Sequence, residues 1–280
     1  MIAVILATLA WAADLPGHVT ESSPHYDIEQ MYGAGDFDAG FAAVQQRIAS
    51  TPDDADLYWL AARFMYEQGE LMGDRPTSER IAHYTQMGAL ANKGLDLRPD
   101  DPHIRFARGL ATARLGTTKG VLSSLFLARS VEADWLAAAN SGMTYASVGE
   151  REVLPTDAYQ ALGVFYRLVP DWWIVQVIAG TRGDLDKSLS YLEKAAAGRV
   201  NIAIYKELGV IRACIATQRD QPELLEKAND AYDKALAMKP ENEKHRIDHK
   251  HIQMLKADPS MACEYSRDGQ QDLDKKKLKN

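Results

Sequence analysis

The sequence contains little cysteine, no long hydrophobic run and no excess of basic charge. Two cysteines in 280 residues are too few for a disulfide-stapled mini-fold or a four-thiolate zinc site. The 39 acidic residues outnumber the 32 basic ones, and the net charge of −7 argues against a nucleic-acid-binding domain, which requires a basic face. The uncharged apolar run at residues 2–12 is too short to cross a bilayer as a helix, and no other stretch is long and apolar enough to do so.

Sequence motifs that carry catalysis are also missing. The sequence has no G-x-S-x-G nucleophile elbow, no S-x-x-K pair and no phosphate-binding P-loop. Four histidines lack a carboxylate or thiol partner close in sequence, namely His18, His25, His83 and His103. We therefore predict that the protein is not an enzyme and uses no cofactor.

The N-terminus has features of an export signal. Residues 2–12 have the length of a signal-peptide apolar region, and Ala10-Trp11-Ala12 provides the small residues of a cleavage site. Pro16-Gly17 would end a helix soon afterwards. No Lys or Arg precedes the run, and the alternative is a buried N-terminal helix. We predict a signal peptide at residues 1–12, a periplasmic or secreted mature chain, and no membrane span after processing.

Export would place both thiols in an oxidising compartment, where exported cysteines tend to pair. Cys214 lies in an apolar, helix-like stretch, and Cys263 lies close to the C-terminus. A Cys214–Cys263 disulfide is one possibility. The alternative is one buried thiol that behaves as a small hydrophobic residue and one partly exposed thiol.

The rest of the chain predicts an all-α fold. Alanine is abundant, and no convincing run of alternating apolar and polar residues indicates a strand. Gly35-Asp36 and Gly183-Asp184 each combine a glycine turn with an aspartate that can cap a following amphipathic helix. Recurrence of one turn-and-helix unit is typical of a repeat protein.

The spacing of small and aromatic residues resembles the tetratricopeptide (TPR) repeat of 34 residues, which folds as two antiparallel helices. Small residues let the two helices approach, and aromatic residues four positions away fill the space beside them. Positions that fit the first helix are Tyr58, Ala62, Tyr66, Gly69, Tyr159, Leu162, Gly163, Tyr166, Tyr205, Leu208 and Gly209, and those that fit the second are Ala228, Tyr232, Ala235 and Pro240. We predict about five irregular helix pairs, stacked as a TPR-like right-handed solenoid over residues 35–257. Residues 13–34 lead into it, and residues 258–280 form a charged tail.

The order of helices resembles two families in particular. GLDLRPDDP is followed by RFARGLATARLG, DAYQALGVFYRLVP and GDLDKSLSYLEKAA, within residues 54–240. This order is similar to that of the T-component proteins of TRAP-type periplasmic transport systems and of the regulator-of-microtubule-dynamics family. The resemblance implies a helical repeat domain that binds partners and carries no catalytic residues.

Candidate binding residues lie in the first helices and in one insertion. On the expected concave face we place Arg63, Tyr66, Arg105, Arg108 and Tyr166. The insertion at residues 169–180 carries Trp172 and Trp173, which we expect to form a plug that folds back into the solenoid. A lid, a partner anchor and a membrane-surface contact are the alternatives.

The histidines at positions 245, 249 and 251 form the densest cluster of potential metal ligands. His245 and His249 share a helical face, whereas His251 faces elsewhere, and zinc requires three or four converging ligands. We predict a solvated helix face and no metal site. Asp36 and Asp38 likewise lack the remaining ligands of a calcium loop, and helix capping explains them.

These features predict an exported, non-catalytic protein-interaction scaffold or adaptor of the periplasm. A protein or peptide partner would bind the concave face of the solenoid. The alternative is a T-component-like accessory subunit of a TRAP-type system, which would oligomerise and handle a small solute. Nucleic acid is not an expected partner. A metal-dependent enzyme that uses the histidine cluster from His245 to His251 is a third hypothesis, and we favour it least.

Overall fold

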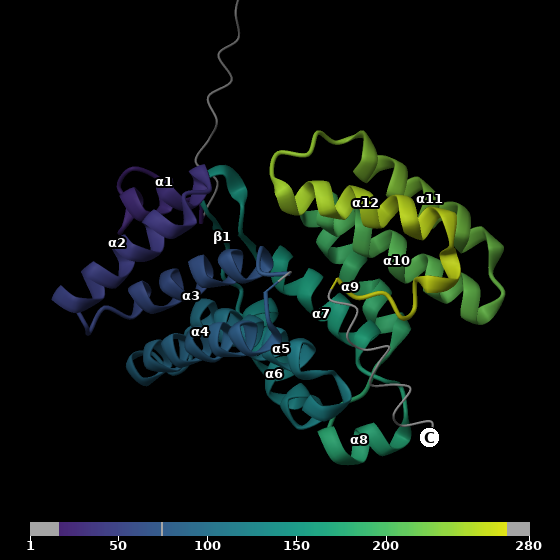
Figure 1. Cartoon of the computed structure of the whole chain (residues 1–280), viewed down its shortest axis with the longest axis horizontal. Helices are drawn as coiled ribbons and strands as arrows, with labels where there is room; N and C mark the ends of the chain where they lie inside the picture. Colours follow the sequence, from purple (N-terminus) through teal and green to yellow (C-terminus); the bar gives the residue numbers. More distant parts are fainter. Residues whose placement is uncertain (1–16, 74, 268–280) are drawn as a thin grey trace, which may run out of the picture.

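The computed structural model describes residues 17–73 and 75–267, which form the predicted all-α fold (Figure 1). The helices of the first half are α1 (Tyr26–Ala34), α2 (Phe37–Ser50), α3 (Ala55–Glu70), α4 (Thr77–Leu97), α5 (Pro102–Lys119), the 3-10 helix η1 (Leu122–Leu127) and α6 (Ala128–Asn140). Those of the second half are α7 (Thr156–Leu168), α8 (Trp173–Ala179), α9 (Leu185–Gly198), α10 (Ile202–Arg219), α11 (Pro222–Ala237), α12 (Glu243–Ala257) and η3 (Pro259–Met261). The predicted signal peptide lies outside the described residues.

A small β-ribbon joins the two halves. Strands β1 (Tyr145–Ala146) and β2 (Val153–Leu154) pair antiparallel on either side of the 3-10 helix η2 (Val148–Glu150). His18 forms a parallel bridge with Ala146, so the ribbon also holds the first described residues against the body.

The helix that follows Gly183 begins as the sequence predicts. The Asp184 carboxylate accepts hydrogen bonds from the backbone N–H groups of Asp186 and Lys187, which have no partner inside the first turn of α9. Asp36 occupies the corresponding position before α2 but makes no side-chain cap. The two turns therefore share their place in the repeat, while only the second uses its aspartate as a hydrogen-bonding cap.

Four helix pairs repeat one close contact. In α3/α4, α5/α6, α7/α9 and α10/α11, a glycine of the first helix lies against a large side chain of the second. A Cβ atom at any of these glycines would lie 2.4 to 2.6 Å from the facing side chain, so another residue could not be placed there without movement. The pairs are Gly69 with Tyr84, Gly109 with Trp135, Gly163 with Leu192, and Gly209 with Tyr232.

The hydrophobic core follows the chain from one helix pair to the next. Phe64 and Tyr84 belong to a cluster formed by α1 to α5, and Trp135 and Phe165 to a second cluster formed by α5 to α8. Two further clusters lie among α9 to α12 and the residues that follow. Helices next to each other in sequence also pack against each other, with α8 as an insertion between α7 and α9. The described chain therefore has a helical-repeat-like fold.

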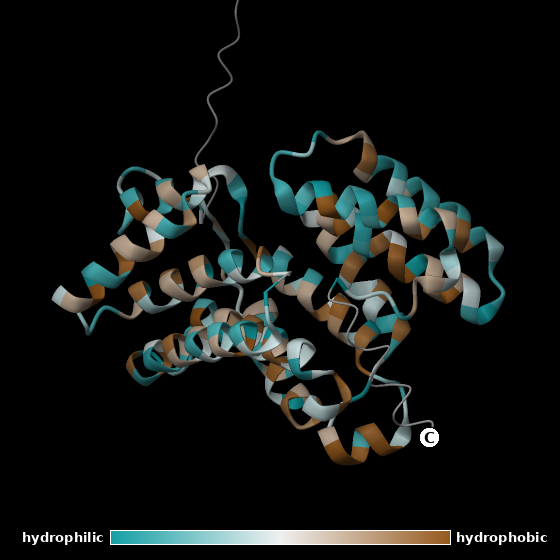
Figure 2. Ribbon diagram, in the orientation of Figure 1, coloured by the Kyte–Doolittle hydropathy of each residue, from teal (hydrophilic) through white to brown (hydrophobic). Residues whose placement is uncertain are grey.

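Apolar residues lie mainly along the contacts between helices, but α8 is brown over nearly its whole length (Figure 2). No helix of the described residues is both long and apolar enough to cross a membrane.

Candidate binding cleft

A cleft of about 1060 Å³ lies between the two halves of the molecule. Its lining includes side chains of α3, α5, α6, α7, α10 and α12. Figure 1 shows α7 in the middle, with α3, α5 and α6 on one side of it and α10 and α12 on the other. Residues 265–267, which follow α12, also line it. No single helix pair contains the cleft, because its walls come from helices far apart in sequence.

Glu70, the last residue of α3, binds two arginines at the cleft. Its Oε1 lies 2.8 Å from Nη2 of Arg114, and its Oε2 lies 2.5 Å from Nη1 of Arg267. Burial alone would raise the pKa of Glu70, but the two arginines hold it below its usual value. One turn earlier, Oε2 of Glu67 lies 2.9 Å from Nζ of Lys244 on α12. These pairs connect α3 directly to the C-terminal part of the fold.

A second ionic cluster surrounds Lys206 of α10. Its Nζ lies 2.7 Å from Oδ1 of Asp248 and 3.2 Å from Oε1 of Glu207. Oε2 of Glu207 in turn accepts a 2.9 Å hydrogen bond from Nη2 of Arg167. Burial would lower the pKa of Lys206, but the neighbouring carboxylates, Asp248 foremost, raise it above its usual value. Lys206 therefore stays charged at neutral pH.

Asp157 differs from the other carboxylates of the cleft. Burial raises its pKa to about 6, against the opposing effect of Arg199, whose Nη1 lies 3.4 Å from Oδ1. Its Oδ2 accepts a 2.8 Å hydrogen bond from the backbone N–H of Val153. Both oxygens thus have structural partners at the start of α7.

The lining of the cleft is apolar on the side of η1, α6 and α7. Side chains there are Val121, Leu125, Val131, Ala161, Val164 and Phe165. Elsewhere in the lining, three buried nitrogen or oxygen atoms have no hydrogen-bond partner among the described residues: Nε of Arg167 near the end of α7, Oγ of Ser266 and Nη2 of Arg267. Buried polar groups are normally hydrogen-bonded, so these atoms mark a place that can bind a polar ligand group.

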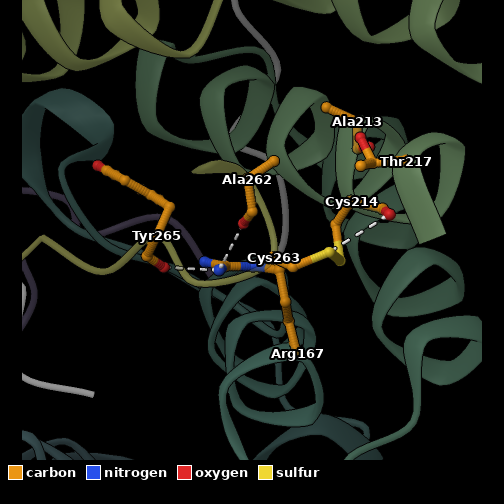
Figure 3. Close-up of a disulfide and its surroundings, with 7 residues drawn as sticks. All are labelled: Arg167, Ala213, Cys214, Thr217, Ala262, Cys263 and Tyr265. Atoms are coloured by element: carbon orange, nitrogen blue, oxygen red, sulfur yellow. Dashed lines mark hydrogen bonds between the residues drawn. A yellow bond between two sulfur atoms is a disulfide. The ribbon is translucent and has the colours of Figure 1, made fainter. Parts of the chain in front are cut away.

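The segment after α12 closes one side of the cleft and is held by a disulfide (Figure 3). Cys263 bonds to Cys214 of α10, which settles the alternative left open by the sequence. Nη1 of Arg167 donates hydrogen bonds to the backbone carbonyls of Ala262 at 3.4 Å and Tyr265 at 2.7 Å. Tyr265 is 6% exposed, so this part of the predicted tail packs into the fold.

Of the residues predicted on the concave face, Tyr66 lines the cleft, and Nζ of Lys244 lies 5.2 Å from the centre of its ring. Arg63 is buried away from the cleft. Its Nη2 lies 3.0 Å from Oε2 of Glu29, and its guanidinium lies 3.8 Å from the ring centre of Tyr32. Arg63 therefore fastens α3 to α1.

The other predicted residues lie at separate places. Arg105 pairs with the exposed Asp100, and Arg108 makes a bidentate pair with Asp134 of α6 at 2.6 and 2.7 Å. Tyr166 donates a 2.6 Å hydrogen bond to Glu132. It also lines, with Trp172, a smaller pocket of about 650 Å³ beside the disulfide. The structure does not gather the seven predicted residues into one site.

The insertion folds back with one face on the core, where Val175 and Ala179 are buried, but it does not fill the central cleft. Trp172 packs partly buried against the core beside α7, whereas Trp173, at the first position of α8, is 73% exposed. Val177 and Ile178 follow on the exposed side of the helix. Phe126 of the neighbouring η1 is exposed as well, and among the described residues α8 contacts chiefly η1.

The three histidines of α12 do not converge. Nε2 of His249 lies 3.1 Å from the backbone carbonyl of Ala235, and Nδ1 of His251 lies 2.8 Å from the hydroxyl of Tyr265. Nδ1 of His245 accepts a 3.2 Å bond from the backbone N–H of Glu241. The predicted solvated face is therefore wrong, since each ring is partly buried and has its own protein partner.

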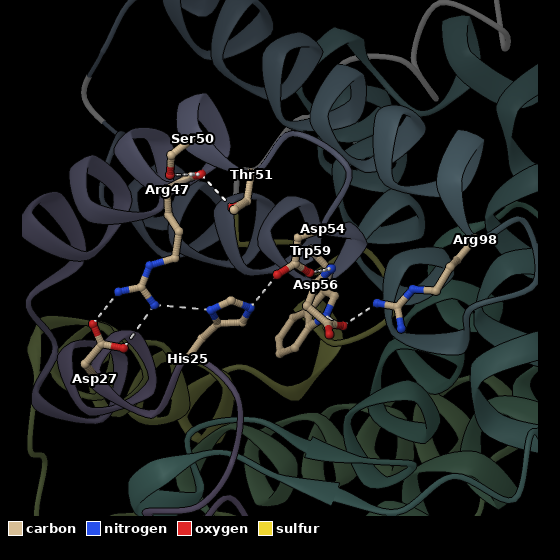
Figure 4. A network of polar contacts seen from close by, with 9 residues as sticks. All are labelled: His25, Asp27, Arg47, Ser50, Thr51, Asp54, Asp56, Trp59 and Arg98. Carbon is tan, nitrogen blue, oxygen red and sulfur yellow. Dashed lines mark hydrogen bonds and ion pairs between the residues drawn. The ribbon is translucent and has the colours of Figure 1, made fainter.

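One group in the described part of the chain has the spacing of a metal site. Ligand atoms of His25, Asp54 and Asp56 all lie within 4.8 Å of one another (Figure 4). Nη1 of Arg47 donates to Nδ1 of His25, so Nε2 carries the proton that it donates to Asp54 at 2.9 Å. Asp56 is paired with Arg98. Because arginines and a ring N–H already use these atoms, the group is a polar network that holds α1 against α3.

Sequence reasoning missed the residues that carry the charges of the cleft, among them Glu70, Lys206, Asp248 and Arg267. Their partners lie up to 197 positions apart, and no local spacing indicates such pairs. No protein-family model matches this chain, and no curated protein is significantly similar to it. The repeat-like fold is compatible with a TPR-like array of helices.

Proposed function

We propose that this chain is an exported, non-catalytic TPR-like binding protein whose ligand site is the central cleft. The cleft itself carries the proposal. Its volume of about 1060 Å³ is slightly above the range, roughly 300–1,000 Å³, of pockets that hold small molecules. Arginine and lysine partners hold the pKa values of Glu70 and Asp248 below their usual range, which suits binding better than proton transfer.

Two features support export. The apolar run at residues 2–12 has the character of a signal peptide, and the Cys214–Cys263 disulfide agrees with an oxidising compartment.

A solute-sized cleft favours an accessory subunit of a solute transport system, of the kind that the helix order resembles. A separate observation favours an interaction scaffold. Trp173, Val177 and Ile178 of α8 and Phe126 of the neighbouring η1 are exposed, and exposed apolar surfaces commonly mark protein interfaces. A subunit that binds a solute in its cleft and docks on a partner through α8 would combine both functions.

Native mass spectrometry of the mature chain, purified gently from its own compartment, tests the proposal. We expect a retained small molecule. Ala161 lines the cleft, and the larger side chain of Ala161→Phe should abolish retention, whereas Ala42→Phe on the exposed side of α2 should not. Two results together would show that the cleft is not a binding site. Wild-type protein would carry no ligand, and cross-linking would recover the same protein partners with wild type and with the Ala161→Phe variant.

A further inference from the structure

The charges that line the cleft balance. Eight Asp and Glu side chains and eight Lys and Arg side chains contribute to its walls. In one cluster Glu70 is paired with two arginines, and in a second Lys206 is paired with two carboxylates. His245 adds no charge at neutral pH, because burial lowers its pKa. A ligand with a net charge would therefore bring an uncompensated charge into a partly buried site, which is costly.

One part of the lining is free of charge, because η1 and α6 contribute no charged side chain to it. Charged side chains line the cleft from α3, α10, α12 and Arg267, and α7 between the two parts contributes apolar side chains together with Asp157 and Arg167. A ligand that contacts both parts needs a polar end and an apolar end.

The unpartnered atoms define the polar end further. The Arg167 side chain is 1% exposed, and its Nε is a donor without a hydrogen-bond partner in the described part of the chain. Nη2 of Arg267 is a second such donor, beside the Glu70 carboxylate. Two arginine donors call for a carboxylate or a similar oxyanion, and the adjacent Glu67 and Glu70 carboxylates can face a positive group.

We propose that the cleft binds a small amphiphile with no net charge, whose zwitterionic head contacts the Glu70–Arg267 wall and whose apolar chain lies against η1, α6 and α7. The inference rests on the proposed function, since it names the chemical class of the ligand in the same cleft. Apolar α-amino acids and alkyl betaines share this chemistry.

A matched series of ligands tests the charge requirement. Calorimetric titration would compare a decyl betaine, decanoate, decylamine and decanol, with leucine and phenylalanine as the amino-acid arm. The betaine should bind about tenfold more tightly than the anion or the cation. The reason is that an uncompensated charge in a partly buried site lowers affinity by at least about tenfold. Each methylene added to its chain should tighten binding about fourfold. Tight binding of the amino acids and not of the betaine would assign the head to a primary ammonium.

Two charge variants separate recognition from a merely structural effect. Glu70→Gln removes a negative charge from the wall and should shift preference toward decanoate. Arg267→Gln removes a positive charge and should shift preference toward decylamine. Glu193→Gln, which removes an exposed carboxylate on α9, is the matched control and should change neither. If one variant does not fold, as judged by circular dichroism, the other still tests the shift.

The outcomes distinguish this inference from the function on which it rests. If wild-type protein binds decanoate or decylamine best, or if neither charge variant changes the preference, the zwitterion assignment is wrong. Retention of another ligand that Ala161→Phe abolishes would leave the cleft as the binding site. If no member of the series binds and the protein retains nothing, both proposals fall.

Discussion

Removal of the Cys214–Cys263 disulfide should lower the free energy of unfolding by about 4 kcal/mol. The bond closes a loop with a sequence separation of 49 residues, and the chain-entropy model gives this value for a loop of that length. A small domain is stable by only about 5–15 kcal/mol, so the change is a large share of the total. We expect the double variant Cys214→Ala/Cys263→Ala to show the full loss.

Urea unfolding followed by tryptophan fluorescence measures the effect. Addition of a thiol reductant should move the wild-type midpoint toward that of the double variant, and should leave the double variant itself unchanged. The reduced protein should also exchange the Tyr265 amide faster, since this amide lies in the segment that the bond holds. Equal stability of the oxidised and reduced wild-type proteins would refute the reasoning.

Three further predictions concern single residues. Asp157→Asn removes a carboxyl whose pKa of about 6 in the folded protein lies above its value of 3.8 in the unfolded chain. As pH falls, this carboxyl therefore binds its proton at a higher pH in the folded state than in the unfolded state. The stability of wild type relative to this variant should therefore rise by about 2 kcal/mol as pH falls from 7 to 4, measured by urea unfolding across that range. Gly209→Ala should destabilise by about 1–2 kcal/mol, because its Cβ would overlap the Tyr232 ring, whereas Gly88→Ala, which meets only ordinary contacts, should stabilise by up to about 1 kcal/mol. Trp173→Ser should leave the melting temperature within about 2 °C of wild type but reduce binding of a hydrophobic dye, since this ring is 73% exposed.

The helix pairs could be predicted from sequence because they depend on local spacing. Gly69, Gly163 and Gly209 recur with aromatic residues at helical intervals, and helix geometry converts such intervals into shared faces. Each of these glycines does lie at the crossing of two helices. The Asp184 cap follows from the same kind of local information.

The cleft could not be predicted, because its residues meet only through the tertiary arrangement. Glu67 pairs with Lys244 across 177 positions. The residues next to each of them in sequence are like those around a charged side chain on the surface of any helix. The packing of Trp172 and Trp173 could not be predicted for a related reason. Adjacent aromatic residues indicate that one side chain is buried, but the sequence does not show what α8 lies against.

The contact between Glu70 and Arg267 also has a consequence for how the protein is made. A chain is synthesised from its N-terminus, and its early parts fold first. Helices α1 to α7 can assemble while synthesis continues, because their contacts are local. The wall formed by residues 265–267 is added only after all of the helices α1 to α12 have been synthesised. A chain that stops before these residues would therefore have its helices but lack one wall of the cleft.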